Sequence, residues 1–365
     1  MGQVDQDGAI LPPQALERAW SREHLRLHRW LLQQPALLPQ GAPLLLAVSG
    51  GQDSMALLGL LLGLQRLHDW RLYLWHGDHG WRSDSSQQAR GLAAWCQTHQ
   101  LKVHVEHHDA AHKPPGAPSS TSEAGARQWR YQALEAHAKA CGCSHVVTGH
   151  TASDRAETLL LNLARGSHRR GLASLPSQRP LDGNGEKERG ASAILLSRPL
   201  LIFSRDETGQ ICRDLQLPIW LDPSNDDRRF SRNRLRHEVL PVLEQLHPGA
   251  VRRLSSTAER LQQEQRCINE WVEVALQWLQ SSEQGPGLQL QRQHLTALQP
   301  ANQAAILERW LGQHGTACAN AKHLRAVVQR LQQGRPPGQI NLNGGWQLRW
   351  NSLTLELIAP TQQAP

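Results

Sequence analysis

Short apolar runs alternate with amphipathic stretches along the first half of the chain. Residues 44–48 form an apolar run that ends in Ser49-Gly50-Gly51, a pattern typical of a buried parallel strand entering a tight turn. Further strands are predicted at 71–76, 103–107 and 145–149, and helices at 54–67, 84–99, 121–140 and 153–165. Strands that alternate with helices predict an α/β domain with a doubly wound parallel sheet.

The second half of the chain has a different pattern. Helices are predicted at about 250–281, 292–311 and 320–333, and the alternation over 339–358 around Asn343-Gly344-Gly345 predicts a hairpin. This half is therefore expected to be a smaller, mainly helical domain with a C-terminal β-hairpin. The expected divisions are an N-terminal extension (1–24), the α/β domain (25–222), an Arg-rich junction (223–245) and the helical domain (246–365).

Composition narrows the class of protein. The 365 residues carry 39 Lys and Arg against 32 Asp and Glu, a net charge of +7 that suits an acidic partner such as nucleic acid. An apolar fraction of 39% excludes a mainly disordered chain. The longest uncharged apolar run, 55–64, is far shorter than the roughly 20 residues of a membrane span. Six scattered cysteines without a Cys-x-x-Cys pair predict reduced thiols and a cytoplasmic protein, and the acidic start is not expected to be a secretory signal.

The first candidate for chemistry is the glycine loop, which we define as residues 49–54, Ser-Gly-Gly-Gln-Asp-Ser. Its glycines let the backbone turn tightly, and the following helix N-terminus directs free N–H groups and a positive dipole at the same place. This predicts a phosphate site, although the Walker lysine is absent. Asp53 would repel a polyphosphate unless a divalent cation lay between them. The alternative is an ordinary Gly-rich strand-to-helix turn.

Two later strand ends face the same crevice of the predicted sheet. After the second strand, Arg82 is a candidate for holding a phosphate or an RNA backbone, and Asp78 for contacting a ribose or a metal. After the fourth, Asp154 and Glu157 lie in the first helical turn, where they would suit magnesium or a general base. The alternatives are a plain surface turn and an acidic helix N-terminus favoured by the dipole alone.

An arginine-rich segment follows the α/β domain. Its five guanidinium groups and one amide predict a phosphate track, or alternatively a solvated basic helix face: Arg228, Arg229, Arg232, Asn233, Arg234 and Arg236. The histidines at 104, 107, 108 and 112 straddle a strand and a loop, so no metal site is predicted there.

Together these motifs resemble the tRNA(Ile)-lysidine synthetases, within the N-type ATP pyrophosphatase (PP-loop) group. The similar segments span about 25–245: S-G-G-Q-D-S at 49–54, D-H-G-W-R at 78–82, E-A-G-A-R-Q-W-R-Y at 123–131, G-H-T-A-S-D-R-A-E-T at 149–158, Arg198-Pro199-Leu200-Leu201, and P-S-N…R-N-x-L-R at 223–236. Trp81 stands where the family usually has Leu, and Thr151, Ser153 and Arg155 where it commonly has His, Asp and Gln. The C-terminal part is also shorter than in the longest members.

The resemblance implies ATP-dependent ligation of free L-lysine onto the wobble cytidine of the CAU-anticodon isoleucine tRNA through an adenylated base. It implies a catalytic set of Asp53, Asp154 and Arg232, with Asp53 also facing Mg²⁺ and Asp154 binding the lysine ammonium or accepting its proton. It implies ATP contacts by Ser49, Gly50, Gly51, Gln52, Asp53, Ser54, His79 and Gly149. It implies substrate contacts by Arg82, Arg127, Arg130, Glu157, Asn233 and Arg236. A homodimer and no membrane partner are also expected.

Three rival functions use some of the same residues. A PP-loop tRNA thiolase would need cysteines near the site, and an amidating ligase would need an ammonia source. A non-catalytic RNA-binding module would not explain the glycine loop and its aspartate. The discriminating observation is whether tRNA-dependent pyrophosphate release requires lysine.

Overall fold

The computed structural model describes residues 20–78, 80, 85–108, 123–181, 193–220, 227–280, 288–318, 320–332 and 335–360, with the backbone only at 123 and 124. The chain forms two compact units, the first reaching to Gln262 and the second starting at Gln263. Two stretches rich in small and polar residues, 109–122 and most of 176–193, lie outside the described residues. No helix in the described part is both long and apolar enough to span a bilayer.

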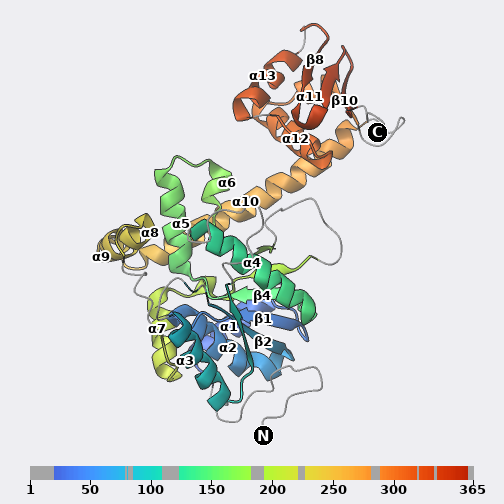
Figure 1. The fold of residues 1–365 in the computed structure, drawn as a ribbon. Coiled ribbons are helices and arrows are strands. Elements are labelled where there is room, and N and C mark those ends of the chain that lie inside the picture. The colour runs from blue at the N-terminus through green and yellow to red at the C-terminus, as the bar shows by residue number, and fades with distance from the viewer. Residues whose placement is uncertain are drawn as a thin grey trace. The chain divides into compact units, whose positions relative to one another are not determined.

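Unit 1 is built on a six-stranded sheet in the order β3-β2-β1-β4-β6-β5 (Figure 1). Five strands are parallel: β1 (Pro43–Ala47), β2 (Arg71–Asp78), β3 (Val103–His107), β4 (His145–Thr148) and β6 (Leu195–Ser197). The short edge strand β5 (Gln178–Pro180) runs antiparallel to β6. The predicted doubly wound sheet is confirmed. The strand order reverses direction between β1 and β4, which makes their carboxyl ends the natural ligand crevice.

Helices cover both faces of this sheet (Figure 1). One apolar core joins the sheet to α1 (Arg22–Gln33), α2 (Gln52–His68), α3 (Ser85–Thr98) and α7 (Arg205–Asp214), together with the turn η2 (Pro199–Ile202). A second core lies under α4 (Glu123–Ala140). Helix α5 (Ala152–Ala164) packs through Ala152 and Ala156 against α9 (Leu240–Leu246) and the start of α10 (Ala250–Leu279).

Helix α2 is the central helix of the first core. Twelve of its 17 residues are buried, because leucines occupy nearly every side of the helix rather than one stripe. The helix begins directly after Gly51 and ends at Asp69, which adopts a left-handed conformation with φ of 55°. The glycine loop is therefore attached to the most enclosed helix of unit 1.

The remaining short elements of unit 1 lie on either side of η2 and α7 in the chain. They are α6 (Arg169–Leu172), α8 (Ser231–Arg234) and the π-helical turn η4 (Leu235–Val239). The last two carry the arginine-rich segment and contact α5. The predicted basic helix face is thus helical, but part of it faces another helix instead of solvent.

Unit 2 combines helices with a four-stranded antiparallel sheet in the order β7-β10-β9-β8. Its elements are β7 (Gln289–Gln291), α11 (Arg292–Thr296), α12 (Pro300–Gln313), α13 (Ala321–Leu331), β8 (Gly338–Asn341), η5 (Asn343–Gly345), β9 (Gln347–Trp350) and β10 (Thr354–Ile358). The predicted hairpin is present as β8 and β9, and β10 and β7 extend it. The predicted helix 292–311 is divided because Pro300 starts a new helix.

Arg292 is a buried polar centre of unit 2. Its side chain is almost inaccessible and donates to four backbone carbonyls: Leu331 at 3.0 Å, Asn351 at 2.6 Å, and Gln332 and Arg335 at 3.0 Å each. These carbonyls belong to the end of α13 and to the segments before β8 and β10. One guanidinium group thus ties three segments of unit 2 together.

We expect Arg292→Met to lower the free energy of unfolding by about 3 kcal/mol or more, because it leaves buried carbonyls without donors. Thermal denaturation followed by circular dichroism measures this. The matched control is Arg325→Met, an exposed arginine on α13, which should change stability by about 0.5 kcal/mol or less. Equal stability of the two variants would show that Arg292 does not hold these three segments together.

Candidate active site

The glycine loop forms a tight turn held by its own hydroxyl groups. The Ser54 hydroxyl accepts from the Ser49 amide at 3.1 Å and donates to the Gly51 carbonyl at 2.9 Å. Gly50 has φ of 83°, and a Cβ there would lie 3.3 Å from the Trp220 ring. The Trp220 amide donates to the Gly50 carbonyl at 3.0 Å. The turn therefore needs glycine for its conformation, and it presents the start of α2 to the crevice as predicted.

Gly149 brings the loop after β4 into direct contact with the backbone of the glycine loop. A Cβ on Gly149 would lie 2.8 Å from the Asp53 carbonyl oxygen and 3.0 Å from the Ser54 nitrogen. No side chain fits in this space, because both neighbours are backbone atoms. The missing side chain is what lets the N-terminal ends of α2 and α5 approach each other.

Asp53 is held by helix α7, which the sequence patterns did not connect to the site. Its carboxylate accepts from Arg205 Nη1 at 2.9 Å and from the Thr208 hydroxyl. Burial raises the pKa of Asp53 to about 6; Arg205 opposes this rise and nearby Asp154 adds to it. Gln52 braces the same contact, since its side-chain amide donates to the Arg205 carbonyl at 2.6 Å and to Thr208 at 3.0 Å.

Asp154 and the buried Glu157 form an ion-pair cluster with Arg232 and Arg236. Glu157 is fully buried, and it accepts from Arg232 Nε and from Arg236 Nε at 2.7 Å each. Asp154 accepts from Arg232 Nη2 at 3.0 Å, and Arg236 lies 3.6 Å away. The structure thus brings together four residues predicted for the site from two distant segments, and it makes Glu157 an anchor for the arginine-rich segment.

The Asp154 carboxylate is also fixed by its own helix terminus. It accepts from the Thr151 amide at 2.8 Å and from the Thr151 hydroxyl at 2.9 Å, completing a capping box at the start of α5. Burial raises the pKa of Asp154, but Arg232, the Thr151 amide and Arg236 together bring that pKa below its ordinary value. Asp154 is therefore ionised across the physiological pH range.

His150 was not among the predicted site residues, although it follows Gly149 directly. Its ring is joined to the Thr148 hydroxyl at 2.9 Å. Burial lowers the pKa of His150 far below the ordinary value; Asp154 opposes this, and Arg198 adds to it. A neutral imidazole therefore lies beside Asp154 at pH 7.

The structure describes only part of the loop after β2, in which site residues were predicted. His79 and Arg82 lie outside the described residues. Asp78 is buried and accepts from the Gly80 amide at 3.0 Å and from the Ser86 hydroxyl at 2.9 Å. Burial raises its pKa, but these hydrogen bonds bring that pKa down to about 2. Both carboxylate oxygens of Asp78 hold the loop, so its observed contacts are structural.

The other predicted substrate contacts differ in their exposure. Arg127 and Arg130 are exposed on α4, and Asn233 is buried with its amide donating to the Asp227 carbonyl at 2.9 Å. In the arginine-rich segment, the exposed side chains form local pairs instead: Arg228 and Arg234 with Glu238, and Arg229 with Asp227. Only Arg232 and Arg236 of the five pair with the acids of α5.

Within the described residues, no group of three or more His, Cys, Asp or Glu side chains is placed to bind a metal ion. His104 instead stacks on His137 with ring centroids 4.1 Å apart and pairs with Glu106. A magnesium ion at Asp53 could take further oxygen ligands from a nucleotide. That arrangement is usual for Mg²⁺, which commonly binds one or two carboxylates together with substrate phosphates.

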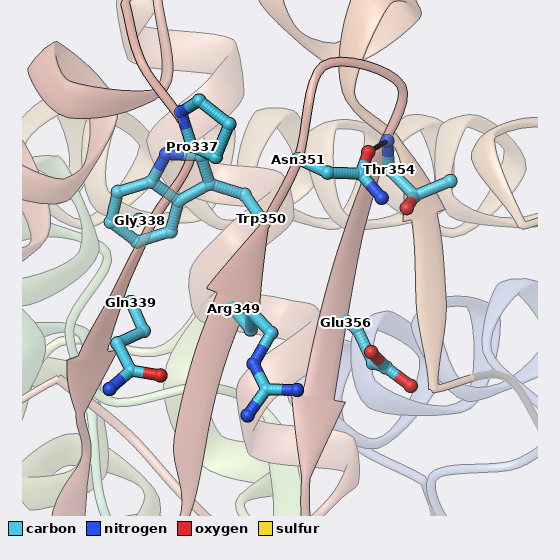
Figure 2. Close-up of a pocket in the computed structure, with 8 residues that line it drawn as sticks. All are labelled: Pro337, Gly338, Gln339, Arg349, Trp350, Asn351, Thr354 and Glu356. Atoms are coloured by element: carbon cyan, nitrogen blue, oxygen red, sulfur yellow. Dashed lines mark hydrogen bonds between the residues drawn. The ribbon is translucent and has the colours of Figure 1, made fainter.

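Unit 2 carries a shallow pocket of about 420 Å³ on its sheet. Figure 2 shows polar side chains on three neighbouring strands along its floor and Trp350 at one end. Gln339, Arg349 and Glu356 are cross-strand neighbours on β8, β9 and β10. The pocket offers a cation, an anion and an amide to a partner, with no deep enclosure.

Comparison with known proteins covers both units. A family model of the PP-loop domain matches residues 26–243, and a model of the TilS substrate binding domain matches residues 290–353. The tRNA(Ile)-lysidine synthase of Parasynechococcus marenigrum (strain WH8102) is 51% identical over 345 residues, which are 94% of this chain and 97% of that protein. A tRNA(Ile)-lysidine synthase of Prochlorococcus marinus is 40% identical over 94% of this chain and 98% of that protein.

Among solved structures, the U34-tRNA thiolase NcsA from Methanococcus maripaludis superposes with a TM-score of 0.53 at 17% sequence identity. The match covers 72% of this chain and 89% of that chain. At this identity the similarity shows a shared fold only.

We expect Gly149→Ala to lower the free energy of unfolding by about 1–3 kcal/mol, because the new methyl group would overlap backbone atoms of the glycine loop. Denaturant unfolding measures this. Gly312→Ala on α12 is the control, since a Cβ there meets open space and alanine favours a helix by about 1 kcal/mol. If Gly149→Ala were as stable as the unmodified chain, the close approach of the two loops would not constrain this position.

Proposed function

This chain belongs to the tRNA(Ile)-lysidine synthase family, and from that premise we propose how its site residues carry out the reaction. The protein is a ligase that forms a carbon–nitrogen bond and makes lysidine on tRNA(Ile) with the use of ATP. The residue assignment rests on one observation. Asp53 lies together with the ion-pair cluster at the carboxyl ends of β1 and β4, and that cluster consists of Asp154, Glu157, Arg232 and Arg236.

We propose that the glycine loop holds the phosphates of ATP. The N-terminus of α2 follows the loop directly, and Ser49, Gly50, Gly51 and Ser54 shape the turn. Gly149 then forms the opposite wall. Gln52 contributes by bracing Arg205 and Thr208, which orient the Asp53 carboxylate.

Magnesium is proposed to bind at Asp53. A buried carboxylate with a raised pKa is poorly satisfied by its present partners, and a divalent cation would stabilise its ionised form. When bound, Mg²⁺ would offset the negative charge that develops on the pyrophosphate leaving group. Arg205 and Thr208 keep Asp53 directed toward that place.

The proposed reaction has two steps. The ring carbonyl oxygen of the wobble cytidine in the CAU anticodon attacks the α-phosphorus of ATP, and pyrophosphate leaves. The neutral ε-amine of free lysine then attacks the activated ring carbon, and AMP leaves as the new carbon–nitrogen bond remains. The cytidine must leave its stack to reach the crevice, which suits recognition of a single-stranded loop.

Asp154 suits electrostatic attraction of the lysine ammonium better than proton removal. Its pKa is held below the ordinary value and it already accepts from Arg232 and Thr151, so it is a weak base. Arg232 is the more exposed of the two paired arginines, with 38% of its side chain accessible against 15% for Arg236. We therefore assign Arg232 to charge stabilisation at the reacting base and Arg236 chiefly to holding Glu157.

The thiolase alternative is not favoured, because the relatives that cover nearly the whole chain are lysidine synthases. Cys212 does contact the glycine loop, with its thiol 3.3 Å from the Gln52 carbonyl. Burial, however, raises the pKa of Cys212 to about 12, so it is not a reactive thiolate. We further propose that the polar sheet of unit 2 contacts tRNA(Ile), and that the enzyme is cytoplasmic and homodimeric.

The function is tested by incubating the protein with ATP, magnesium, labelled lysine and either the CAU isoleucine tRNA or the methionine tRNA with the same anticodon. We expect label to enter only the isoleucine tRNA, with one pyrophosphate released per lysidine formed. Pyrophosphate release without incorporation of label would retain an adenylating site but refute lysine as the nucleophile.

The pH dependence tests the assignment of Asp53. Because Asp53 must be ionised to bind magnesium, kcat/KM for magnesium-ATP, which reports the free enzyme, should fall as pH decreases through about 6. Arg205→Gln removes a charge that lowers this pKa, so the acid limb should move to higher pH by about one unit. Arg213→Gln, an exposed arginine on the same helix, should leave the limb in place. A limb that did not move in Arg205→Gln would exclude Asp53 as the group that titrates.

A further inference from the structure

The first turn of α7 is joined to two neighbouring helices through the carboxylate of Glu207, all within unit 1. Its Oε1 accepts from Arg26 Nη1 of α1 at 2.5 Å and from Arg252 Nη2 at the start of α10 at 2.6 Å. Its Oε2 accepts from the Ser204 amide at 2.8 Å, and the Ser204 hydroxyl accepts from the Glu207 amide at 3.3 Å, which completes a capping box. Both oxygens of Glu207 are therefore used within the fold.

The same turn of α7 holds the carboxylate of Asp53. Arg205, two residues before Glu207, and Thr208, one residue after it, both donate to Asp53. Arg205 has a long, flexible side chain that is 34% exposed, so packing alone does not fix the direction of its guanidinium group. A single helical turn thus connects Asp53 to α1 and α10.

The start of α7 is also tied to the start of α5, which carries Asp154. The Arg205 amide donates to the Ser153 hydroxyl at 3.0 Å. The Ala152 amide donates to the Phe203 carbonyl, just before α7, at 2.8 Å. The first turn of α7 therefore joins both carboxylate-bearing helices of the site, α2 and α5.

The body of α7 is fixed by apolar packing, whereas part of its first turn is fixed by charge. Ile211 and Cys212 are buried in the core around α2. Gly209 lies so close to α2 that a Cβ there would come within 3.2 Å of the Gln52 side chain. The partly exposed side of the first turn instead relies on Glu207 and its two arginines, whose side chains are 39% and 59% exposed. Removing this charge should therefore loosen the first turn and leave the body of the helix in place.

We propose that Glu207 is a positioning residue for magnesium and ATP. Its two ion pairs fix the first turn of α7, and that turn sets the direction in which Arg205 and Thr208 hold Asp53. Glu207 acts through the helix and not on a ligand, because its oxygens are taken up by its partners in the fold. This inference rests on the proposed function, in which Asp53 faces magnesium. It adds that α1 and α10 contribute to the nucleotide site through α7.

Glu207→Gln is the variant that separates positioning from helix formation. Glutamine also serves in a capping box, so the variant keeps an acceptor for the Ser204 amide and removes the charge that holds the two arginines. Asp206→Asn is the matched control, because it removes the same charge from the same helix turn at an exposed position. An effect of the helix dipole alone should therefore appear in both variants.

Isothermal titration calorimetry measures how α,β-methylene ATP, which cannot release pyrophosphate, binds to the protein in the presence of magnesium. We expect Glu207→Gln to raise the dissociation constant about threefold to tenfold, as for the loss of two partly exposed ion pairs. Asp206→Asn should bind as the wild-type chain does. In lysidine formation, Glu207→Gln should raise the KM for magnesium-ATP and leave the KM values for lysine and tRNA unchanged.

A double variant tests whether Glu207 acts through Arg205. Arg205→Gln combined with Glu207→Gln should weaken binding by clearly less than the product of the two single effects, because coupled residues are not additive. Effects that multiply would overturn the inference. An unchanged dissociation constant in Glu207→Gln, or an equal loss in Asp206→Asn, would overturn it as well.

Arg252→Gln gives a second test that does not change α7 itself. This variant leaves the capping box and the Arg26 pair intact, and it should raise the dissociation constant about twofold. Wild-type binding that did not depend on magnesium would refute the placement of magnesium at Asp53, and this inference with it. The calorimetry uses neither lysine nor tRNA, so a chain that forms no lysidine would refute the proposed function without altering the binding result.

Discussion

The paired contact of Glu157 with Arg232 and Arg236 is the interaction on which the site depends. A fully buried carboxylate is tolerated in a protein interior only when its charge is compensated, and here two arginines supply that compensation. Those arginines come from a short helix and a π-helical turn with little apolar packing of their own. Glu157 thereby fixes the arginine-rich segment to α5, and with it the position of Arg232 beside Asp154.

Charge is nearly balanced at the floor of the crevice. Asp53, Asp154 and Glu157 are matched by Arg205, Arg232 and Arg236, so the floor of the crevice is close to neutral. A reaction that joins three substrates in order requires each to arrive in one orientation, so the fixed directions of these paired side chains matter more than their net charge.

Local sequence patterns predicted those parts of the site that depend on local geometry. The strand at 103–107 was predicted to the residue, and the glycine loop and the acids of α5 were found because a strand end followed by a helix start has its own signature. Arg205 and Thr208 were missed, since their role arises only when α7 packs on α2. Pro300 shows the converse case, because the break it causes in the predicted helix was visible in the sequence.

The burial of α2 on nearly all sides also affects the order in which parts of the protein unfold. Amide hydrogens in a helix buried on nearly all sides exchange with solvent only when the surrounding domain unfolds, whereas edge elements such as β5 open locally. The second half of the glycine loop, with Asp53, belongs to that protected helix, while the arginine-rich segment belongs to short peripheral elements. Partial unfolding at the periphery would therefore release Arg232 and Arg236 first and leave the glycine loop folded. The glycine loop is therefore expected to be the last part of the site to unfold and the first to refold.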